Sequence, residues 1–227
     1  MPENALIVGA GSGLSASLAR LFAKNGMKVA LAARNIGKLD ALLKETGAKA
    51  YACDSSEPAQ VASLFAAVER DLGPLDIAVF NAGYRTRGPV AELDIEEVRK
   101  TIISSAFGGF LVAQAAAKSM LKQGKGSIFL TGASASVKGY PQSAPFAMGK
   151  FALRGLAQSM ARELQPKNIH VAHVVIDGGI AAPDRPARGL DAMLSADAIA
   201  ENYLHLHRQS RSAWSWEIEV RPWVENF

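Results

Sequence analysis

The stretch ALIVGAGSGLS, residues 5–15, decides the fold of this chain. A short apolar run ends in three glycines at alternate positions, Gly9, Gly11 and Gly13, and a periodic segment follows. This pattern predicts a buried strand, a tight turn and the first turn of a helix. Main-chain N–H groups at such a helix start bind anions, most simply the pyrophosphate of a dinucleotide. The alternative is an ordinary turn, because the spacing is not a clean G-x-G-x-x-G.

The composition favours one globular domain over residues 1–227. Of the 227 residues 49% are hydrophobic and 20% are charged, which suffices for one well-filled core. The net charge of +4 is mild and its Lys and Arg residues are scattered, so we expect no nucleic-acid partner. No apolar run is long enough to span a membrane, and residues 1–4 do not begin a signal peptide. We therefore expect a cytoplasmic protein without membrane contact.

Cysteine and histidine usage gives no sign of a disulfide or a metal site. Cys53 is the single cysteine, and we expect it to be a small buried residue at a strand end rather than a reactive thiol. His173 lies inside an apolar run, which favours a hydrogen-bonded core imidazole. No cysteine, histidine and acid set has metal-site spacing, so we expect no metal.

Strand-like and helix-like segments alternate along the whole chain. Nearly continuous apolar runs such as 75–80 are typical of strands that are covered on both faces, as in a parallel sheet. The alternation predicts an α/β fold with a doubly wound parallel sheet of Rossmann type. Residues 181–190 lack periodicity, and we expect a mobile flap there. After the first strand we expect further strands at 28–33, 49–53, 75–80, 126–131, 170–176 and 216–220. We expect helices at 14–25, 36–46, 58–72, 107–120 and about 150–165, and two more that begin at residues 94 and 195.

Further motifs stand at the ends of the expected strands and helices. Asp54 follows the strand at 49–53, Asn81-Ala82-Gly83 follows the strand at 75–80, and Lys150 opens the long helix. The sequence DGGI occupies residues 177–180, after the strand at 170–176. Together with the glycine turn, these motifs resemble the short-chain dehydrogenase/reductase family over essentially the full length. In this resemblance Gly9 and Gly13 match the first two required glycines of the cofactor turn, and Ser15 stands at the third.

The resemblance implies a bound nicotinamide dinucleotide. NAD-specific members of the family place an acid at the end of the second strand, whereas this chain has Ala33 followed by Arg34. A guanidinium pairs with the 2′-phosphate that a carboxylate would repel, so we expect NADP(H). The cofactor-binding residues that the resemblance implies are Gly9, Gly11, Ser12, Gly13, Leu14, Arg34, Asp54, Asn81, Ala82, Gly83, Lys150, Gly178 and Ile180.

The proton relay of the family is altered in this sequence. The position that resembles the catalytic tyrosine holds Phe146, the relay asparagine aligns with Ser105, and the catalytic serine aligns with Ala133. Lys150 is retained, so we expect it to bind the ribose hydroxyls of the cofactor.

Two hydroxyl groups are candidates to replace the missing proton donor. For Ser134 there are two alternatives: its hydroxyl polarises a substrate carbonyl, or it only forms a hydrogen bond within the turn after the strand. For Tyr140 the alternatives are a substitute proton donor and an aromatic residue that lines the pocket wall. Tyr84 is a weaker candidate of the same kind. The catalytic set that we predict is Lys150, Ser134 and Tyr140.

Two functions fit this pattern. The first is an oxidoreductase that passes hydride between NADP(H) and a small carbonyl or alcohol substrate, with an atypical proton donor. The second is an NADP(H)-binding protein whose chemistry has lapsed and which serves as a sensor or partner subunit. The small-residue segment 104–120 resembles the family's dimer-forming helix, which implies a homodimer or homotetramer. Five basic residues lie in loops that we expect around the mouth of the site. They attract an acidic substrate or the extra phosphate of the cofactor, or they are ordinary solvated charges. These residues are Arg85, Arg87, Lys138, Arg185 and Arg188.

Overall fold

The computed structural model describes residues 2–182, 189 and 191–225. Within them, seven parallel strands form one sheet in the order β3-β2-β1-β4-β5-β6-β7. The doubly wound parallel sheet of Rossmann type is thereby confirmed, with the strand order reversing between β1 and β4. The strands are β1 (Asn4–Val8), β2 (Lys28–Ala33), β3 (Lys49–Ala52), β4 (Ile77–Phe80), β5 (Gly126–Thr131), β6 (Ile169–Ile176) and β7 (Glu217–Val220).

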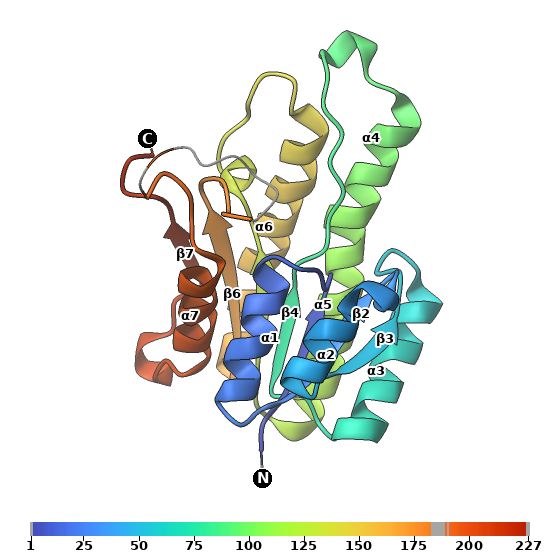
Figure 1. Ribbon diagram of the computed structural model, residues 1–227, viewed down its shortest axis with the longest axis vertical. Helices are drawn as coiled ribbons and strands as arrows, with labels where there is room; N and C mark the ends of the chain where they lie inside the picture. The colour runs from blue at the N-terminus through green and yellow to red at the C-terminus, as the bar shows by residue number, and fades with distance from the viewer. Residues whose placement is uncertain (1, 183–188, 190, 226–227) are drawn as a thin grey trace.

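Helices cover both faces of the sheet (Figure 1). On one face α1, α2 and α7 bury side chains such as Phe22, Leu42 and Tyr203 against the strands. On the other face α3, α5 and α6 bury residues such as Leu64 and Leu153. Two apolar layers thus enclose strands that are apolar on both sides. The helices are α1 (Leu14–Lys24), α2 (Asp40–Thr46), α3 (Pro58–Leu72), α4 (Ile95–Ile102), α5 (Gly108–Gln123), α6 (Ala144–Leu164) and α7 (Ala196–His207).

Three helical boundaries differ from the sequence-based expectation. The segment 36–46 divides into a 3-10 turn, Ile36–Leu39, and α2, because the Asn35 side chain accepts from the Gly37 N–H and tightens the first turn. A π-helical turn, Ile103–Phe107, joins α4 to α5, so the two expected helices are continuous. Helix α6 begins at Ala144 rather than near Lys150, since Pro145 is compatible with a first helical turn. The expected flap at 181–190 falls mostly outside the described residues.

The carboxyl ends of the strands share one edge of the sheet. In Figure 1 the chain after β4 and the amino-terminal part of α6 extend beyond this edge. The glycine turn after β1 packs directly on the segment after β4. Gly9 has φ +92°, and a Cβ placed on it would lie 2.4 Å from the main-chain N of Ala82. Only glycine fits this contact, which brings the two segments together where the strand order reverses.

Candidate functional site

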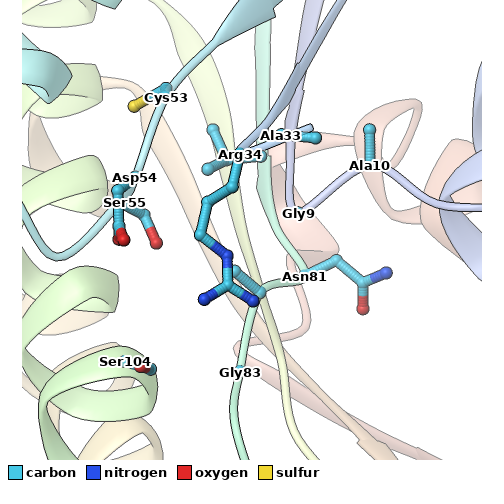
Figure 2. A pocket seen from close by; sticks show the side chains of 12 residues that line it. Gly9, Ala10, Ala33, Arg34, Cys53, Asp54, Ser55, Asn81, Gly83 and Ser104 are labelled. Carbon is cyan, nitrogen blue, oxygen red and sulfur yellow. The ribbon is translucent and has the colours of Figure 1, made fainter. Parts of the chain in front are cut away.

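A pocket of about 220 Å³ opens at the carboxyl edge of β1, β2 and β4 (Figure 2). Six of the residues predicted to bind a cofactor line it: Gly9, Arg34, Asp54, Asn81, Ala82 and Gly83. Sequence reasoning did not assign a binding role to its other lining residues, which are small or apolar and carry no distinctive pattern. Those are Val8, Ala10, Ala33, Cys53, Ser55 and Ser104. Cys53 is buried at the end of β3, as expected, and burial raises the pKa of its thiol to about 11.

The start of α1 next to this pocket fits an anionic group. Helix α1 begins after Gly13 with no side-chain cap and no acid in its first turn, so among the described residues no side chain accepts from its leading N–H groups. A Cβ at Gly11 or Gly13 would meet nothing within 4 Å, which leaves the approach open. Of the other predicted turn residues, Ser12 is exposed and Leu14 is buried under the turn. A free helix start and open glycines fit a pyrophosphate.

Ser15 fixes the turn to the end of β4. Its hydroxyl donates to the Gly9 carbonyl at 2.9 Å and accepts from Asn81 Nδ2 at 2.8 Å. The hydroxyl therefore forms a bridge that a glycine at this position would lack. Asn81 accordingly holds two loops in register as well as lining the pocket.

Arg34 reaches from the end of β2 across the pocket. In the view of Figure 2 its guanidinium lies between Asp54 and Asn81. The Asp54 carboxylate accepts from the Ser56 main-chain N–H at 3.0 Å and from the Ser56 hydroxyl at 2.6 Å. Although partial burial opposes ionisation, these bonds and the charge of Arg34 lower the pKa of Asp54. The pocket therefore contains a cation, Arg34, and an anion, Asp54, that interact electrostatically.

A second, larger cleft of about 900 Å³ adjoins the first and shares Asn81, Ala82 and Gly83 with it. It brings together the predicted residues Lys150, Ser134, Tyr140, Gly178 and Ile180. The predicted binding and catalytic residues thus lie along two adjoining cavities. The remaining lining residues include Tyr84, Arg85, Arg87, Thr131, Phe146, Ile176, Asp177, Met193 and Glu225.

Lys150 is buried at the floor of this cleft. Its Nζ donates to the Thr131 carbonyl at 2.7 Å and lies 5.8 Å from the centroid of the Phe146 ring. Burial lowers the pKa of Lys150 to about 8, so the group is still an ammonium at neutral pH. An ammonium has three N–H donors, and one of them is used by Thr131. The others are available to a ligand in the cleft.

The structure separates the candidate hydroxyl groups. Ser134 lines the cleft, whereas Ser136 is buried and accepts from the Ala133 N–H at 3.1 Å, closing the turn after β5. Tyr140 lies at the mouth of the cleft and is 42% exposed. Tyr84 also lines the cleft, but its hydroxyl donates to Glu97 at 2.5 Å. This bond makes Tyr84 a poor proton donor, since its hydroxyl already has an acceptor.

One polar network at the cleft, around Asp177, was not predicted. Asp177 is 2% exposed and pairs with Lys138 and Arg221, each at 3.0 Å. These partners come from separate loops, so no local pattern announces them. In contrast, the Ser105 hydroxyl is buried in the π-helical turn and has no hydrogen-bond partner among the described residues.

His173 is a core imidazole, as expected. Its Nδ1 lies 2.9 Å from Glu217 Oε2, and Glu217 also binds Arg154 through two bonds of 2.6 and 2.7 Å. Burial lowers the pKa of His173 to about 4, so the ring is neutral at pH 7. This network ties β6, β7 and α6 together behind Lys150.

Comparison with known proteins agrees with the family resemblance of the sequence motifs. The sequence profile of the short chain dehydrogenases matches residues 3–184. The chain belongs to this family. A crystal structure of a short-chain dehydrogenase from Rhodopseudomonas palustris is 36% identical, with a TM-score of 0.85 over 97% of this chain and 99% of that one.

Two other members of the family are informative. A single-residue variant of the actinorhodin polyketide ketoreductase, solved with NADPH, is 25% identical, with a TM-score of 0.91 over 100% of this chain and 98% of that one. The "inactive 2-(S)-hydroxypropyl-CoM dehydrogenase 2" of Xanthobacter autotrophicus is 34% identical over 77% of each chain. The first relatives found are matched over 66% to 76% of their own length. Members of this oxidoreductase family bind nicotinamide cofactors, NADPH or NADP in two of the similar solved structures.

Among the described residues, none of the helices is both long and apolar enough to cross a membrane. In the same part of the chain, histidine, cysteine and acidic side chains form no cluster of three or more that could hold a metal ion.

Proposed function

We propose that this protein transfers a hydride between NADP(H) and a small carbonyl compound or alcohol, with an atypical proton donor. The observation that carries the proposal is the placement of Lys150. Its ammonium is buried in a cleft that shares three residues with the pocket at the glycine turn. A dinucleotide lying across both cavities would have its phosphates at the start of α1 and its ribose next to Lys150.

When bound, NADP(H) would supply the hydride. The start of α1 would hold the pyrophosphate through main-chain N–H groups, and Arg34 would hold the 2′-phosphate with paired charge-assisted hydrogen bonds. Lys150 would donate its remaining N–H groups to the ribose hydroxyls. The proposed cofactor-binding residues are Gly9, Gly11, Ser12, Gly13, Leu14, Arg34, Asp54, Asn81, Ala82, Gly83, Lys150, Gly178 and Ile180.

Proton transfer is the step that the chain must perform in an unusual way. Phe146 stands in the position that resembles the family's catalytic tyrosine, and its ring has no proton to donate. Ser134 would donate a hydrogen bond to the substrate carbonyl, since its hydroxyl makes no hydrogen bond with the described residues. Tyr140, at the mouth of the cleft, would supply the proton directly or through water.

The experiment measures NADPH binding by fluorescence and NADPH oxidation with a panel of aldehydes and ketones. We expect binding and measurable turnover, with turnover reduced at least tenfold in Tyr140→Phe or Ser134→Ala. A matched control is Tyr51→Phe, because Tyr51 is hydrogen-bonded to Asp71, away from both cavities. Turnover unaffected by both substitutions at the cleft would contradict the assignment of the proton donor.

The second candidate function is an NADP(H)-binding protein without catalysis. Two observations favour it: Phe146 at the cleft and the unpartnered Ser105 hydroxyl behind it, where a working relay would need hydrogen-bonding groups. NADPH binding in the absence of any carbonyl turnover, in the parent and in Phe146→Tyr alike, would favour this function. An active parent protein would exclude it.

We further propose that two or four copies of the chain assemble through α5 and α6. These helices carry exposed apolar side chains, among them Phe107 beside α5, Phe110, Met148 and Phe151. Exposed aromatic residues on adjoining helices are typical of a subunit interface.

A further inference from the structure

Two arginines that line the cleft are not among the proposed cofactor-binding residues. Arg85 and Arg87 follow Asn81-Ala82-Gly83 in the chain, and both line the cleft that contains Lys150. The guanidinium carbon of Arg85 is 4.7 Å from the centroid of the Phe146 ring, and Lys150 Nζ is 5.8 Å from the same centroid. The aromatic ring therefore has a guanidinium and an ammonium close to it, within one cavity.

Ser143 holds the two arginines together. Its hydroxyl accepts from Arg85 at 3.3 Å and from Arg87 at 3.5 Å, and Ser143 is 1% exposed. Ser143 precedes α6 but does not cap it with its side chain. The hydroxyl therefore orients the two guanidinium groups rather than satisfying the helix. The Gly88 N–H donates to the Gln142 carbonyl at 3.1 Å, which joins the same two loops.

Neither arginine has a carboxylate within 4.0 Å among the residues that the structure describes, unlike Arg154, which pairs with Glu217. Burial and the neighbouring charge of Arg87 both lower the pKa of Arg85, which reflects a cost of holding the two cations together. A guanidinium has five N–H donors, and Ser143 satisfies one from each arginine. Most donors of the pair are therefore available to an anion.

Among the described residues, the carboxylates that line the cleft form no ion pair with these two arginines. Asp177 is bonded to Lys138 and Arg221, and Glu225 lines the cleft without an ion pair to either arginine. An anion that enters the cleft would meet two oriented guanidinium groups, with the Lys150 ammonium in the same cavity.

We propose that Arg85 and Arg87 bind the carboxylate of the substrate, so that the carbonyl compounds this protein reduces are small oxo acids. The reduction of the oxo acid rests on the proposed function, whereas the binding of its carboxylate does not. The planar fork of a guanidinium matches a carboxylate through two parallel hydrogen bonds. Ser143 presents two such groups side by side, and the carbonyl of a short oxo acid would then extend from them toward Phe146 and Lys150.

The experiment compares acids with neutral molecules of the same shape. The probes are 2-oxopentanoate, 3-oxobutanoate and 4-oxopentanoate, each beside its primary amide. Binding is measured by calorimetry on the protein with and without NADP⁺, and turnover by NADPH oxidation. The variant Arg85→Gln/Arg87→Gln removes both charges and both guanidinium forks but keeps the aliphatic stems as far as Cδ and a polar amide at their ends. The control is Arg99→Gln, since Arg99 pairs with Glu96 on the exposed face of α4.

We expect at least one acid to bind about tenfold to a hundredfold more tightly than its amide, as for hydrogen bonds to charged groups. This preference should disappear in the double variant and persist in the control. Equal binding of acid and amide, no binding of any acid, or a preference that survives in the double variant would each overturn the proposal. Because calorimetry needs no turnover, acid binding without NADPH oxidation would support this site while contradicting the proposed reaction.

Discussion

Restoring a phenol at position 146 tests the proposed chemistry most directly. Phe146→Tyr adds one hydroxyl to a half-buried ring on α6, one turn before Lys150. The backbone need not move, because the ring is already in place.

The expected size of the effect follows from the charges near this ring. Lys150 Nζ lies 5.8 Å from the ring centroid. At that separation, with an effective dielectric of about 20, the phenolate would gain about 3 kcal/mol. That energy corresponds to about 2 pKa units and lowers a phenol pKa from about 10 to about 8. Arg85, whose guanidinium carbon is 4.7 Å from the ring centroid, would add to the shift, while partial burial of the phenolate would oppose it. A positioned acid of this pKa typically raises the rate by about 10² to 10⁴.

The assay is kcat/KM for NADPH-dependent carbonyl reduction between pH 6 and pH 9.5. We expect Phe146→Tyr to exceed the parent by about tenfold or more. This gain is below the full range because the family resemblance places Ser105 and Ala133 where the relay asparagine and serine would stand. Reduction needs the protonated phenol, so the gain should vanish as the pH rises through about 8. The matched control is Phe151→Tyr, an exposed phenylalanine on the same helix. No gain at any pH, or an equal gain in the control, would refute the reasoning.

Three further predictions concern the cofactor, stability and assembly. Arg34→Gln should reduce the preference for NADPH over NADH about tenfold to a hundredfold, measured by fluorescence titration, and unchanged relative affinities would contradict the role of this residue. The pKa of His173 is about 4 in the fold against 6.5 in the unfolded chain, so the unfolded chain binds more protons between these values. Stability should therefore fall as pH drops from 6.5 to 4, by about 3 kcal/mol, and urea unfolding of His173→Phe should show a smaller loss over that window. Light scattering should give the mass of a dimer or tetramer at micromolar concentration, and Phe151→Glu should lower it; a monomeric parent would exclude the proposed interface.

Local patterns predicted the elements of the fold well. The glycine turn at Gly9 and the apolar run that becomes β4 each depend on neighbouring residues, so the sequence indicates them directly. The cap of α7 is equally local, since Ser195 Oγ accepts from the Ala198 N–H three residues on. The π-helical turn at Ile103–Phe107 was not predicted. A π-helical turn and a break between two helices differ in their main-chain hydrogen bonds, and the sequence pattern does not show these bonds.

The site was predictable where a motif spans a few residues and unpredictable where distant loops meet. Short motifs singled out Asn81 and Lys150, and both residues line the larger cleft. The grouping of Arg85 and Arg87 on Ser143 depends on contacts across 58 and 56 residues, which no periodicity encodes. Likewise, the buried position of Ser136, whose hydroxyl accepts from the Ala133 N–H and closes the turn, was not predicted.

The packing of Gly9 on Ala82 determines which glycine can serve as a mutational probe of ligand binding. Alanine at position 9 would place its Cβ 2.4 Å from a main-chain atom, so the variant would damage the sheet edge before any ligand was added. Loss of binding in that variant would say nothing about the ligand. Alanine at Gly11 meets no atom within 4 Å. We expect Gly11→Ala to keep the parent's unfolding free energy while it crowds whatever occupies the start of α1, which makes it the informative substitution.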